Sequence, residues 1–400
     1  MSKARILIVT PKSPSTNPRM RKAADALAKS GYEVMVLWAY GTAWAAQNDH
    51  SICTNAQWQS SQIGGNPDSE RITYFFSRLL RKSFELIGNN ERAQCRSYNE
   101  FIRHGLAWKP DLVIGHNPGA LGPVIHIGQK LQVPIWFDAE DYHRGESYVV
   151  RAGIEDRMIA LEDRYTPQLS AMTAASPLIT KAYTELYPQQ TVLTINNAFS
   201  KTLQPSAPER MTGPLRIVWF SQVVGIDRGL QDFMKGMASA SDIPVHLSLV
   251  GLCSNENREV LESCIEHPIH QLSFHEPMPE PALFEFLGQH EIGLALEFPT
   301  PKNRDICRTN KLYTYPLAGC FMLASKTTSQ VHFIEEYPAT GEIIDLTSVN
   351  SVSQTVQNHY QNRVDLLARR QAAWALGESK LNWEVESANL IGVAENLLQE

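Results

Sequence analysis

The feature that most constrains the fold is an apolar strand followed by a helix and then by a second apolar strand. Residues 4–11 read ARILIVTP, a continuous apolar run typical of a strand buried on both faces of a parallel sheet. Residues 20–31 carry Ala and Leu side chains at helical spacing and end at Gly31, which predicts a helix. Residues 32–39, YEVMVLWA, predict the second strand. These segments together predict a β-α-β unit with parallel strands and a right-handed crossover.

The same alternation of apolar strands and helices recurs along the rest of the chain. Residues 200–214 interrupt it with three prolines, one glycine and no apolar period, so they predict an interdomain linker. We therefore predict an α/β protein of two Rossmann-like, doubly wound domains with a ligand cleft between them. The further strands expected before the linker are 111–118, 133–141, 169–176 and 191–198, and those after it are 215–221, 245–251, 270–274, 291–297 and 320–325.

The composition argues against several classes of protein. A net charge of −6 disfavours a general nucleic-acid binder, which would carry a basic face. The six cysteines form no CxxC pair, which argues against a zinc site or a disulfide framework. No stretch is apolar for long enough to span a bilayer and the first residues lack a signal-peptide core, so we expect a cytoplasmic protein. The first strand-to-helix turn, residues 10–22, contains no glycine, which disfavours an NAD or FAD enzyme.

Two segments of the first half break the regular pattern. Residues 41–71 are polar and lack an apolar period, so we expect a long loop or an irregular excursion there. Residues 71–88, RITYFFSRLLRKSFELIG, place aromatic and aliphatic side chains on a broad arc beside several cations. This pattern is most typical of a helix that faces the core. The alternative is a helix that rests on an anionic membrane surface.

Cations at expected helix starts indicate that an anion binds there. Lys311 lies at the start of an expected helix, where the helix dipole disfavours a positive charge unless an anion is present. Arg228 and Gly229 follow the first strand of the second domain, in a turn whose backbone N–H groups and guanidinium suit a phosphate. Arg228 and Lys311 could therefore hold a diphosphate from two sides. Asn17 and Arg19 occupy the corresponding first turn of the chain.

A dense charged cluster follows the expected strand 133–141, and three interpretations of it are open. It binds hydroxyl groups of a ligand, with Asp141 or His143 assisting proton transfer; it chelates a metal through its carboxylates and His143; or it is a structural salt-bridge turn. His116 ends the neighbouring strand, where it either lines the same cleft or packs inside the domain. The cluster consists of Asp138, Glu140, Asp141, His143, Arg144 and Glu146.

Several sequence blocks carry a resemblance to a known family. They are, in chain order, NPRMRKAADALAKSGYEVMVL, KPDLVIGHNPGALGPV, VPIWFDAEDYH, TVLTINNAF, IVWFSQVVGIDRGLQDF, NKLYTYPLAG and LNWEVESANLIGVAENLL. In content and order they resemble glycosyltransferases with the two-Rossmann GT-B fold, in particular those of family 4. The resemblance spans almost the whole chain.

The resemblance implies transfer of a sugar from a nucleotide-diphosphate sugar to a glycan, lipid-linked or small-molecule acceptor, with retention and without a metal or further cofactor. It implies an acceptor-side domain of residues 1–205, a donor domain of residues 206–377, and a helix, 378–400, that returns to the first domain. The implied donor-binding residues are Ser221, Gln222, Arg228, Gly229, Gly251, Asn310, Lys311 and Thr314. The implied catalytic residues are Asp141, His143 and Glu297, and the acceptor or cleft residues are Asn17, Arg19, His116, Glu140, Arg144 and Glu146.

The sequence departs from the family pattern at three donor-site positions. Gln222 stands where the family has an arginine, and Ile306 and Thr314 stand where it has two glutamates. We expect Lys311 to supply the missing positive charge, and Glu297 is the nearest candidate carboxylate. These departures keep open the alternative of a non-catalytic GT-B binding protein. A nucleotide-sugar epimerase of the same fold is the other alternative.

Overall fold

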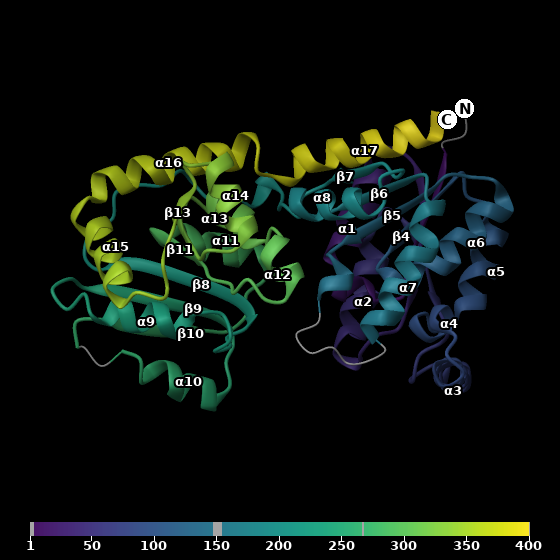
Figure 1. The fold of residues 1–400 in the computed structure, drawn as a ribbon, viewed down its shortest axis with the longest axis horizontal. Coiled ribbons are helices and arrows are strands. Elements are labelled where there is room, and N and C mark those ends of the chain that lie inside the picture. The colour runs from purple at the N-terminus through teal and green to yellow at the C-terminus, as the bar shows by residue number, and fades with distance from the viewer. Residues whose placement is uncertain (1–3, 147–153, 266–267, 400) are drawn as a thin grey trace. The chain divides into compact units, whose positions relative to one another are not determined.

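The computed structural model describes residues 4–146, 154–265 and 268–399, which fold into two compact units (Figure 1). The N-terminal unit comprises Met1–Asn196 together with Ser387–Glu400, and the C-terminal unit comprises Asn197–Glu386. Each unit is built on one parallel β-sheet, which confirms the predicted α/β class with two Rossmann-like domains. The last helix, α17 (Trp383–Gln399), returns to the N-terminal unit from residue 387 onward, as predicted.

The sheet of the N-terminal unit has seven parallel strands in the order β3-β2-β1-β4-β5-β6-β7. Residues 6–9 of β1 are fully buried, so both faces of this strand are covered, as its continuous apolar run requires. The strands are β1 (Arg5–Thr10), β2 (Glu33–Ala39), β3 (Gln59–Ile63), β4 (Leu112–His116), β5 (Ile135–Glu140), β6 (Ala171–Ala174) and β7 (Val192–Thr194). The helices are α1 (Pro18–Lys29), α2 (Ala43–Asn55), α3 (Arg71–Leu86), α4 (Asn90–Gln94), α5 (Tyr98–Trp108), α6 (Leu121–Leu131), α7 (Ile154–Tyr165) and α8 (Pro177–Leu186).

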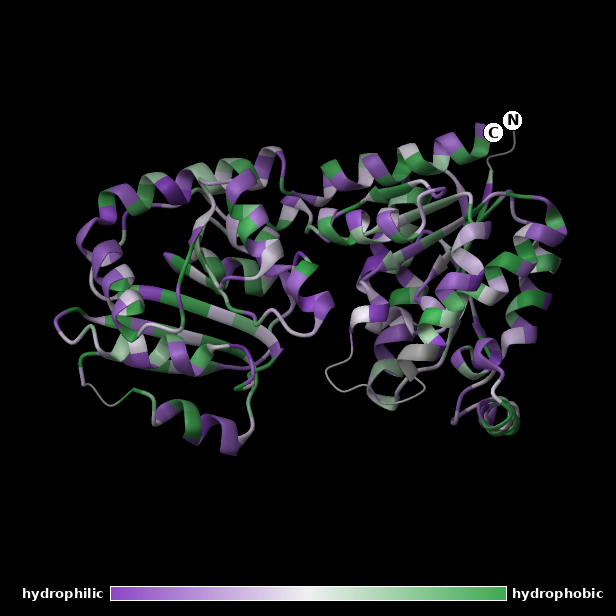
Figure 2. Ribbon diagram, viewed as in Figure 1, coloured by the Kyte–Doolittle hydropathy of each residue, from purple (hydrophilic) through white to green (hydrophobic). Residues whose placement is uncertain are grey.

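The sheet of the C-terminal unit has six parallel strands in the order β10-β9-β8-β11-β12-β13. In Figure 2, α16 and α17 alternate between hydrophilic and hydrophobic residues along their lengths, as helices with one buried face do. The strands are β8 (Leu215–Val223), β9 (Val245–Leu252), β10 (Gln271–His275), β11 (Ile292–Ala295), β12 (Phe321–Ala324) and β13 (Gly341–Ile343). The helices are α9 (Leu230–Ala238), α10 (Asn255–Glu262), α11 (Glu280–Gly288), α12 (Lys302–Ile306), α13 (Lys311–Ala318), α14 (Thr328–Glu336), α15 (Val349–Gln361) and α16 (Arg363–Ser379).

The predicted interdomain linker, residues 200–214, is wrong, because this segment lies within the C-terminal unit. The indole N–H of Trp374 donates to the carbonyl oxygen of Pro205 (3.0 Å), and Gln204 donates to the carbonyl oxygen of Trp374 (2.9 Å). Further along the segment, Gln371 donates to the carbonyl oxygen of Pro208 (3.2 Å). Its prolines therefore mark an extended segment that packs along α16 rather than a free connection.

The expectation of an irregular excursion at 41–71 is also wrong. The segment forms α2, which buries only Ala45 and Asp49, and the edge strand β3, whose sequence is QSSQI. Asp49 accepts a hydrogen bond from the backbone N–H of Ser15 (2.7 Å), which ties α2 to the first turn of the unit. Neither element has an apolar stripe, because each contributes little to the core.

Helix α3 matches the predicted helix at 71–88 in its extent but not in its environment. It contains no buried residue, so the interpretation as a core-facing helix is wrong. Within the described part of the chain, no helix combines the length and the apolar character needed to cross a membrane.

Candidate functional site

The candidate site of the C-terminal unit lies at the carboxyl-terminal edge of its sheet, where parallel α/β sheets commonly bind ligands. There β11 ends at Ala295, two residues before Glu297, and β8 ends at Val223, five residues before Arg228. Helix α13 begins at Lys311 and has no acidic residue in its first turn. The partial positive charge at this helix end is therefore not offset by the helix's own side chains.

Tyr315 fixes α13 against the sheet. Its hydroxyl lies 3.0 Å from the carbonyl oxygen of Leu294 and 3.3 Å from that of Val218, so one side chain joins α13 to both β11 and β8. The ring packs on Gly293, where a Cβ atom would come within 2.2 Å of it. Because Lys311 precedes Tyr315 by one helical turn, this anchor also sets the position of Lys311.

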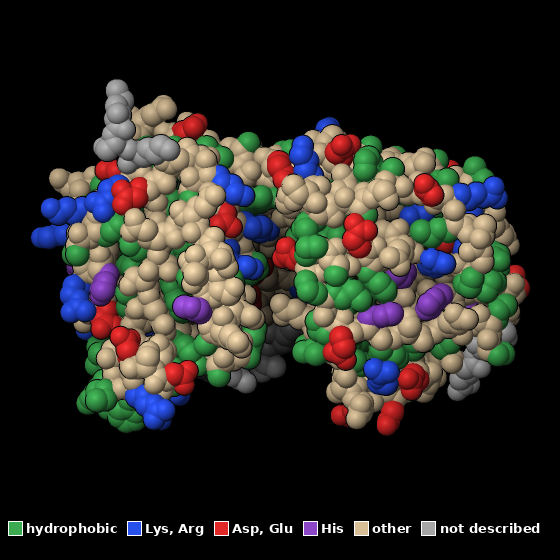
Figure 3. Space-filling view, turned by 180° about the vertical axis from the view of Figure 1, so that it is seen from behind, with side chains coloured by type: hydrophobic (Ala, Val, Ile, Leu, Met, Phe, Trp, Pro, Cys, Tyr) green, Lys and Arg blue, Asp and Glu red, His purple; other side chains and the backbone are tan. Residues whose placement is uncertain are grey.

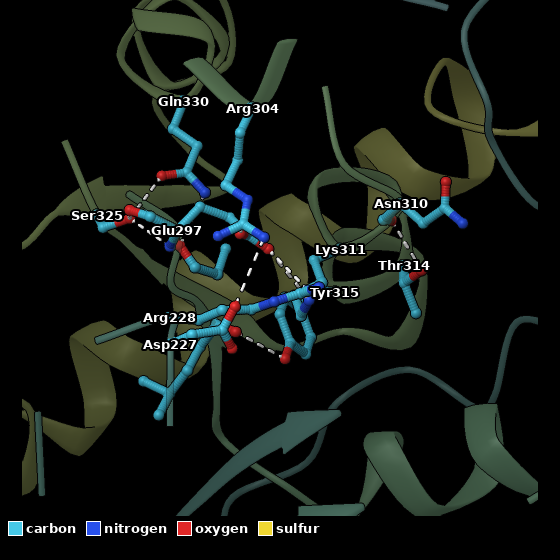
Figure 4. Close-up of polar contacts among 12 residues, drawn as sticks. Asp227, Arg228, Glu297, Arg304, Asn310, Lys311, Thr314, Tyr315, Ser325 and Gln330 are labelled. Atoms are coloured by element: carbon cyan, nitrogen blue, oxygen red, sulfur yellow. Dashed lines mark hydrogen bonds and ion pairs between the residues drawn. The ribbon is translucent and has the colours of Figure 1, made fainter. Parts of the chain in front are cut away.

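Three cations surround the buried carboxylate of Glu297, and they come from three different elements (Figure 4). The Nη1 atom of Arg228 lies 3.2 Å from Oε1 and the Nζ atom of Lys311 lies 3.8 Å from the same oxygen. The Nε atom of Arg304, in α12, lies 3.5 Å from Oε2. Arg304 also lies 3.7 Å from Asp227, an exposed carboxylate. Among the contacts that the described residues make here, three cations thus meet two carboxylates.

Lys311 is almost fully buried in this cluster, with 6% of its surface exposed. Burial lowers its pKa to about 8; the carboxylate of Glu297 limits the decrease, and Arg228 and Arg304 add to it. The ammonium also lies 5.3 Å from the ring centre of Trp219 and 5.6 Å from that of Phe220, within range of a cation–π interaction. An additional anion at this position would raise the pKa of Lys311 and stabilise its charge.

Glu297 is held in place by its backbone. Its N–H donates to the hydroxyl of Ser325 (2.7 Å), and the same hydroxyl lies 2.6 Å from its carbonyl oxygen. Gln330 accepts from that hydroxyl and donates to the carbonyl of Ala295 (2.8 Å). Oε2 of Glu297 is itself buried, and among the described residues it is held by the ion pair with Arg304 (3.5 Å) rather than by a hydrogen bond.

A cavity of about 650 Å³ opens at this cluster. It brings together six residues predicted for the site: Ser221, Gln222, Arg228, Glu297, Asn310 and Lys311. Its other lining residues are mainly apolar and include Phe220, Val250, Pro277, Met278 and Leu283. The cavity therefore combines a cationic end with apolar walls, which suits a ligand that carries both a polyanion and a flat ring.

Three residues predicted for the donor site are not among the residues that line this cavity: Gly229, Gly251 and Thr314. Gly229 adopts a positive φ of 78° at the start of α9. Gly251 lets β9 approach β8, since a Cβ atom would come within 2.3 Å of the carbonyl oxygen of Ser221. The hydroxyl of Thr314 donates to the carbonyl oxygen of Asn310 (2.8 Å) within α13. Sequence reasoning also missed Arg304, whose signal was the charged run 302–308, and Asp227, which directly precedes Arg228.

A second polar group lies at the carboxyl-terminal edge of the other sheet. Arg19 forms a two-pronged ion pair with Asp138 (2.7 and 2.8 Å), and its remaining nitrogen donates to the carbonyl of Ile195 (2.8 Å). His116 lies 3.3 Å from Asp138, and burial lowers its pKa to about 4, so it is neutral at pH 7. Asn17 donates to Asn117 (3.0 Å) and caps α1 through the N–H of Met20. In this group the charges are paired inside the fold.

The predicted charged cluster at 138–146 is divided among several contacts. His143 lies 2.7 Å from Glu146, and this contact raises the pKa of His143 above its usual value although burial alone would lower it. Arg144 donates to the buried Glu162 (2.7 Å) and also contacts Asp163 and Tyr187. Among the described residues, no three His, Cys, Asp or Glu side chains are grouped as metal ligands.

Glu140 has a backbone conformation that is unusual for a residue with a side chain. Its φ is 60°, in the left-handed region, and it coincides with a register shift between β5 and β6. Burial and the neighbouring Asp141 raise the pKa of its carboxyl group. Strained, buried acidic groups of this kind often belong to functional sites.

Comparison with known proteins relates the chain to others by structure. No protein-family model matches it, and no curated protein is similar to it in sequence. The structure of HepE (Alr3699) from Anabaena in complex with UDP and glucose has a TM-score of 0.69 at 12% identity, over 98% of this chain and 100% of that one. A glycosyltransferase from Rickettsia africae has a TM-score of 0.65 at 10% identity over 100% of both chains. A mutant of S. aureus TarM, in complex with fondaparinux, α-GlcNAc-glycerol and UDP, has a TM-score of 0.70 at 8% identity, over 99% and 100%.

These similarities extend over the whole length of the chains. They show that the two parallel-sheet units have the GT-B fold that is found in glycosyltransferases. At identities near 10% they establish the fold and leave the chemistry to be argued from the residues of this chain.

Proposed function

We propose that the chain is a glycosyltransferase that binds a nucleotide-diphosphate sugar in the cavity of its C-terminal unit. The observation that carries the proposal is that Arg228, Arg304 and Lys311 meet around a single buried carboxylate at the N-terminus of α13. A diphosphate would supply the negative charge that this cluster lacks. The neighbours in complex with UDP support the choice of a nucleotide diphosphate over other polyanions.

In this proposal Arg228 and Lys311 bind the diphosphate and stabilise it as the leaving group. The charge on the departing diphosphate increases in the transition state, and preorganised cations in a cavity with little water stabilise such charge most effectively. Glu297 keeps the three cations in position. The apolar walls formed by Pro277 and Met278 would contact the nucleotide base.

We further propose that transfer proceeds with retention and without a metal. The bond between the anomeric carbon and the diphosphate breaks, and its electron pair stays on the phosphate oxygen. That oxygen takes the proton of the acceptor hydroxyl while the new bond forms on the same face of the sugar, so a strong protein base is not required. A glycan, a lipid-linked glycan or a small molecule is the proposed acceptor, with Asn17, His116 and Glu140 as candidate acceptor contacts.

The test combines ligand binding with turnover. We expect UDP or a UDP-sugar at about 100 times its Kd to add roughly 2.7 kcal/mol to the free energy of unfolding, measured by thermal shift. Lys311→Met and Arg228→Ala should abolish most of this shift, whereas the matched control Arg369→Ala, an exposed arginine on α16, should keep it. The proposal fails if a panel of nucleotide diphosphates and their sugars produces no shift in the wild-type protein.

Analysis of the reaction products, with and without an acceptor, distinguishes the two alternatives. A nucleotide-sugar epimerase would convert the donor without any acceptor, and product analysis by chromatography detects this. A non-catalytic binding protein would bind the donor but never release nucleotide diphosphate with any acceptor. One observation favours this alternative: Thr314 occupies a family glutamate position with its hydroxyl bonded inside α13.

A further inference from the structure

Helix α3 exposes nearly all of its large apolar side chains. Ile72 and Leu86 are 75% and 80% exposed, and Phe75, Phe76, Leu79 and Leu80 are all more than half exposed. No residue of this helix is buried. Soluble proteins seldom expose so large an apolar surface unless it is an interaction site.

The exposed apolar side chains form one continuous face. At about 100° per residue, Phe75, Leu86, Leu79, Ile72, Phe76 and Leu80 follow one another over an arc of about 140°, in which only Ser83 is polar. Figure 3 shows this group as hydrophobic side chains beside basic ones at the lower corner of the N-terminal unit. A helix with a wide apolar face and a basic flank is typical of helices that lie in a membrane interface.

Basic side chains flank the apolar face of α3. Arg71, Arg78 and Lys82 lie together along one edge of the apolar arc and are exposed. The helix carries four cations, counting Arg81, and one acid, Glu85, so its net charge is 4 − 1 = +3 in a chain whose net charge is −6. Glu85 is itself paired with Arg157 of α7 (3.2 Å). The charge is therefore complementary to an anionic surface.

A small cavity beside α3 is also lined by both apolar and basic side chains. It measures about 230 Å³ and lies between α3 and the segment that leads from α4 into α5. Its apolar lining includes Phe76, Leu80 and Phe84, and two cations, Arg81 and Arg92, belong to the same lining. An apolar chain that ends in a phosphate fits this combination, which favours lipid over a protein partner.

We propose that α3 binds the surface of an anionic lipid bilayer, with its apolar arc inserted among the headgroups and its cations facing lipid phosphates. The inference rests on the N-terminal unit alone and does not depend on the proposed donor chemistry. Membrane binding would bring the enzyme to acceptors that are anchored in the bilayer.

Vesicle co-sedimentation of the full-length protein tests this proposal. We expect binding to vesicles of phosphatidylcholine with phosphatidylglycerol, at least tenfold weaker binding to phosphatidylcholine alone, and weakening with added salt. Phe75→Ser with Leu79→Ser should reduce binding by more than tenfold, since each exposed ring or leucine side chain would otherwise be buried. Arg78→Glu with Lys82→Glu should also reduce it at least tenfold.

Matched double variants control for nonspecific effects. Val349→Ser with Val364→Ser removes exposed apolar side chains elsewhere, and Lys29→Glu with Lys130→Glu reverses exposed charges elsewhere in the N-terminal unit. Both should bind vesicles like the wild type, and circular dichroism should show all variants folded. The proposal is overturned if the wild type binds no vesicles, or if the α3 variants bind as well as the controls. It is also overturned if sedimentation velocity shows a dimer that Phe75→Ser with Leu79→Ser dissociates, because a second copy would then cover α3.

Discussion

The two sheets of this protein carry cations at the same place, beyond the carboxyl ends of their central strands, and use them differently. In the N-terminal unit Arg19 is paired with Asp138 through two contacts of 2.7 and 2.8 Å, and Thr173 donates to the same carboxylate (2.8 Å). In the C-terminal unit Arg228, Arg304 and Lys311 converge on Glu297 at 3.2 to 3.8 Å. One cluster is neutralised within the fold, and the other retains an excess of positive charge.

This difference separates a cation that supports the fold from cations that are available to a ligand. A guanidinium with a two-pronged carboxylate partner could bind an external anion only by breaking that pair. The longer contacts around Glu297 and the lowered pKa of Lys311 support the proposal that a further anion binds at this cluster.

The largest effect should come from Asp138→Ala, which leaves Arg19 buried and unpaired. We expect the free energy of unfolding to fall by about 3–5 kcal/mol, measured by urea denaturation. Glu297→Gln, in the cluster of the C-terminal unit, should cost only about 1–3 kcal/mol. With saturating UDP, the free energy of unfolding of Glu297→Gln should move back toward that of the wild type. The deficit of Asp138→Ala relative to the wild type should remain. Equal losses in the two variants would remove the contrast between the clusters.

Lys311→Met should weaken UDP binding by about 2–5 kcal/mol, because it removes a buried cation from the proposed phosphate site. Titration calorimetry of the two proteins measures this directly. Arg228→Ala should have a smaller effect, since its side chain is 31% exposed and solvent screens it. Lys302→Ala, which changes an exposed lysine at the start of α12, serves as the control and should bind UDP normally.

The same Lys311→Met variant should be more stable than the wild type at pH 7 in the absence of ligand. The pKa of Lys311 falls from 10.5 to about 8 in the folded protein, so the folded state binds its proton less tightly than the unfolded state. Its charge therefore destabilises the fold below pH 8, by roughly 2–3 kcal/mol, and this penalty vanishes as the pH rises from about 8 to 10.5. In urea unfolding, Lys311→Met should be more stable than the wild type at pH 7, and this difference should be smaller at pH 9.5. A variant that is less stable than the wild type at pH 7 would contradict the lowered pKa of Lys311.

The smallest effect concerns the pH dependence of binding. UDP affinity of the wild type should be constant up to about pH 8 and then fall by up to tenfold per pH unit as Lys311 loses its proton. Lys311→Arg, which keeps its charge, should move this fall to higher pH, and Lys311→Met should show no such fall. A titration series between pH 7 and pH 9.5 tests all three proteins.

Most of the fold could be predicted because strands buried on both faces leave a strong signal in the sequence. The apolar run at residues 6–9, and the similar runs in the other central strands, are accommodated only in the interior of a sheet that is covered on both faces. The errors fall on exposed elements. Helix α2 and strand β3 touch the core at few positions, so their sequences carry no apolar period. Helix α3 has a strong apolar period, and periodicity alone does not reveal whether the apolar face meets a core or something outside the chain.

The site was predictable where local electrostatics left a trace. Lys311 stood out because a cation at a helix start is unfavourable without an anion, and Arg228 because it follows a strand end. Arg304 was missed, since its approach to Glu297 depends on the irregular path of the chain between β11 and α13. Whether Arg19 was free could not be inferred either, because its partner Asp138 lies 119 residues away.

The ionisation of Lys311, followed by NMR of the full-length protein with ¹³C-labelled lysine, tests the central claim most directly. The Lys311 resonance is the one that disappears in Lys311→Met. Without ligand it should titrate with a pKa of about 8, and saturating UDP should raise that value by at least one unit, since a bound diphosphate stabilises the charged form. If no nucleotide diphosphate changes the titration of the Lys311 resonance, the claim that this cation cluster binds a nucleotide diphosphate is contradicted.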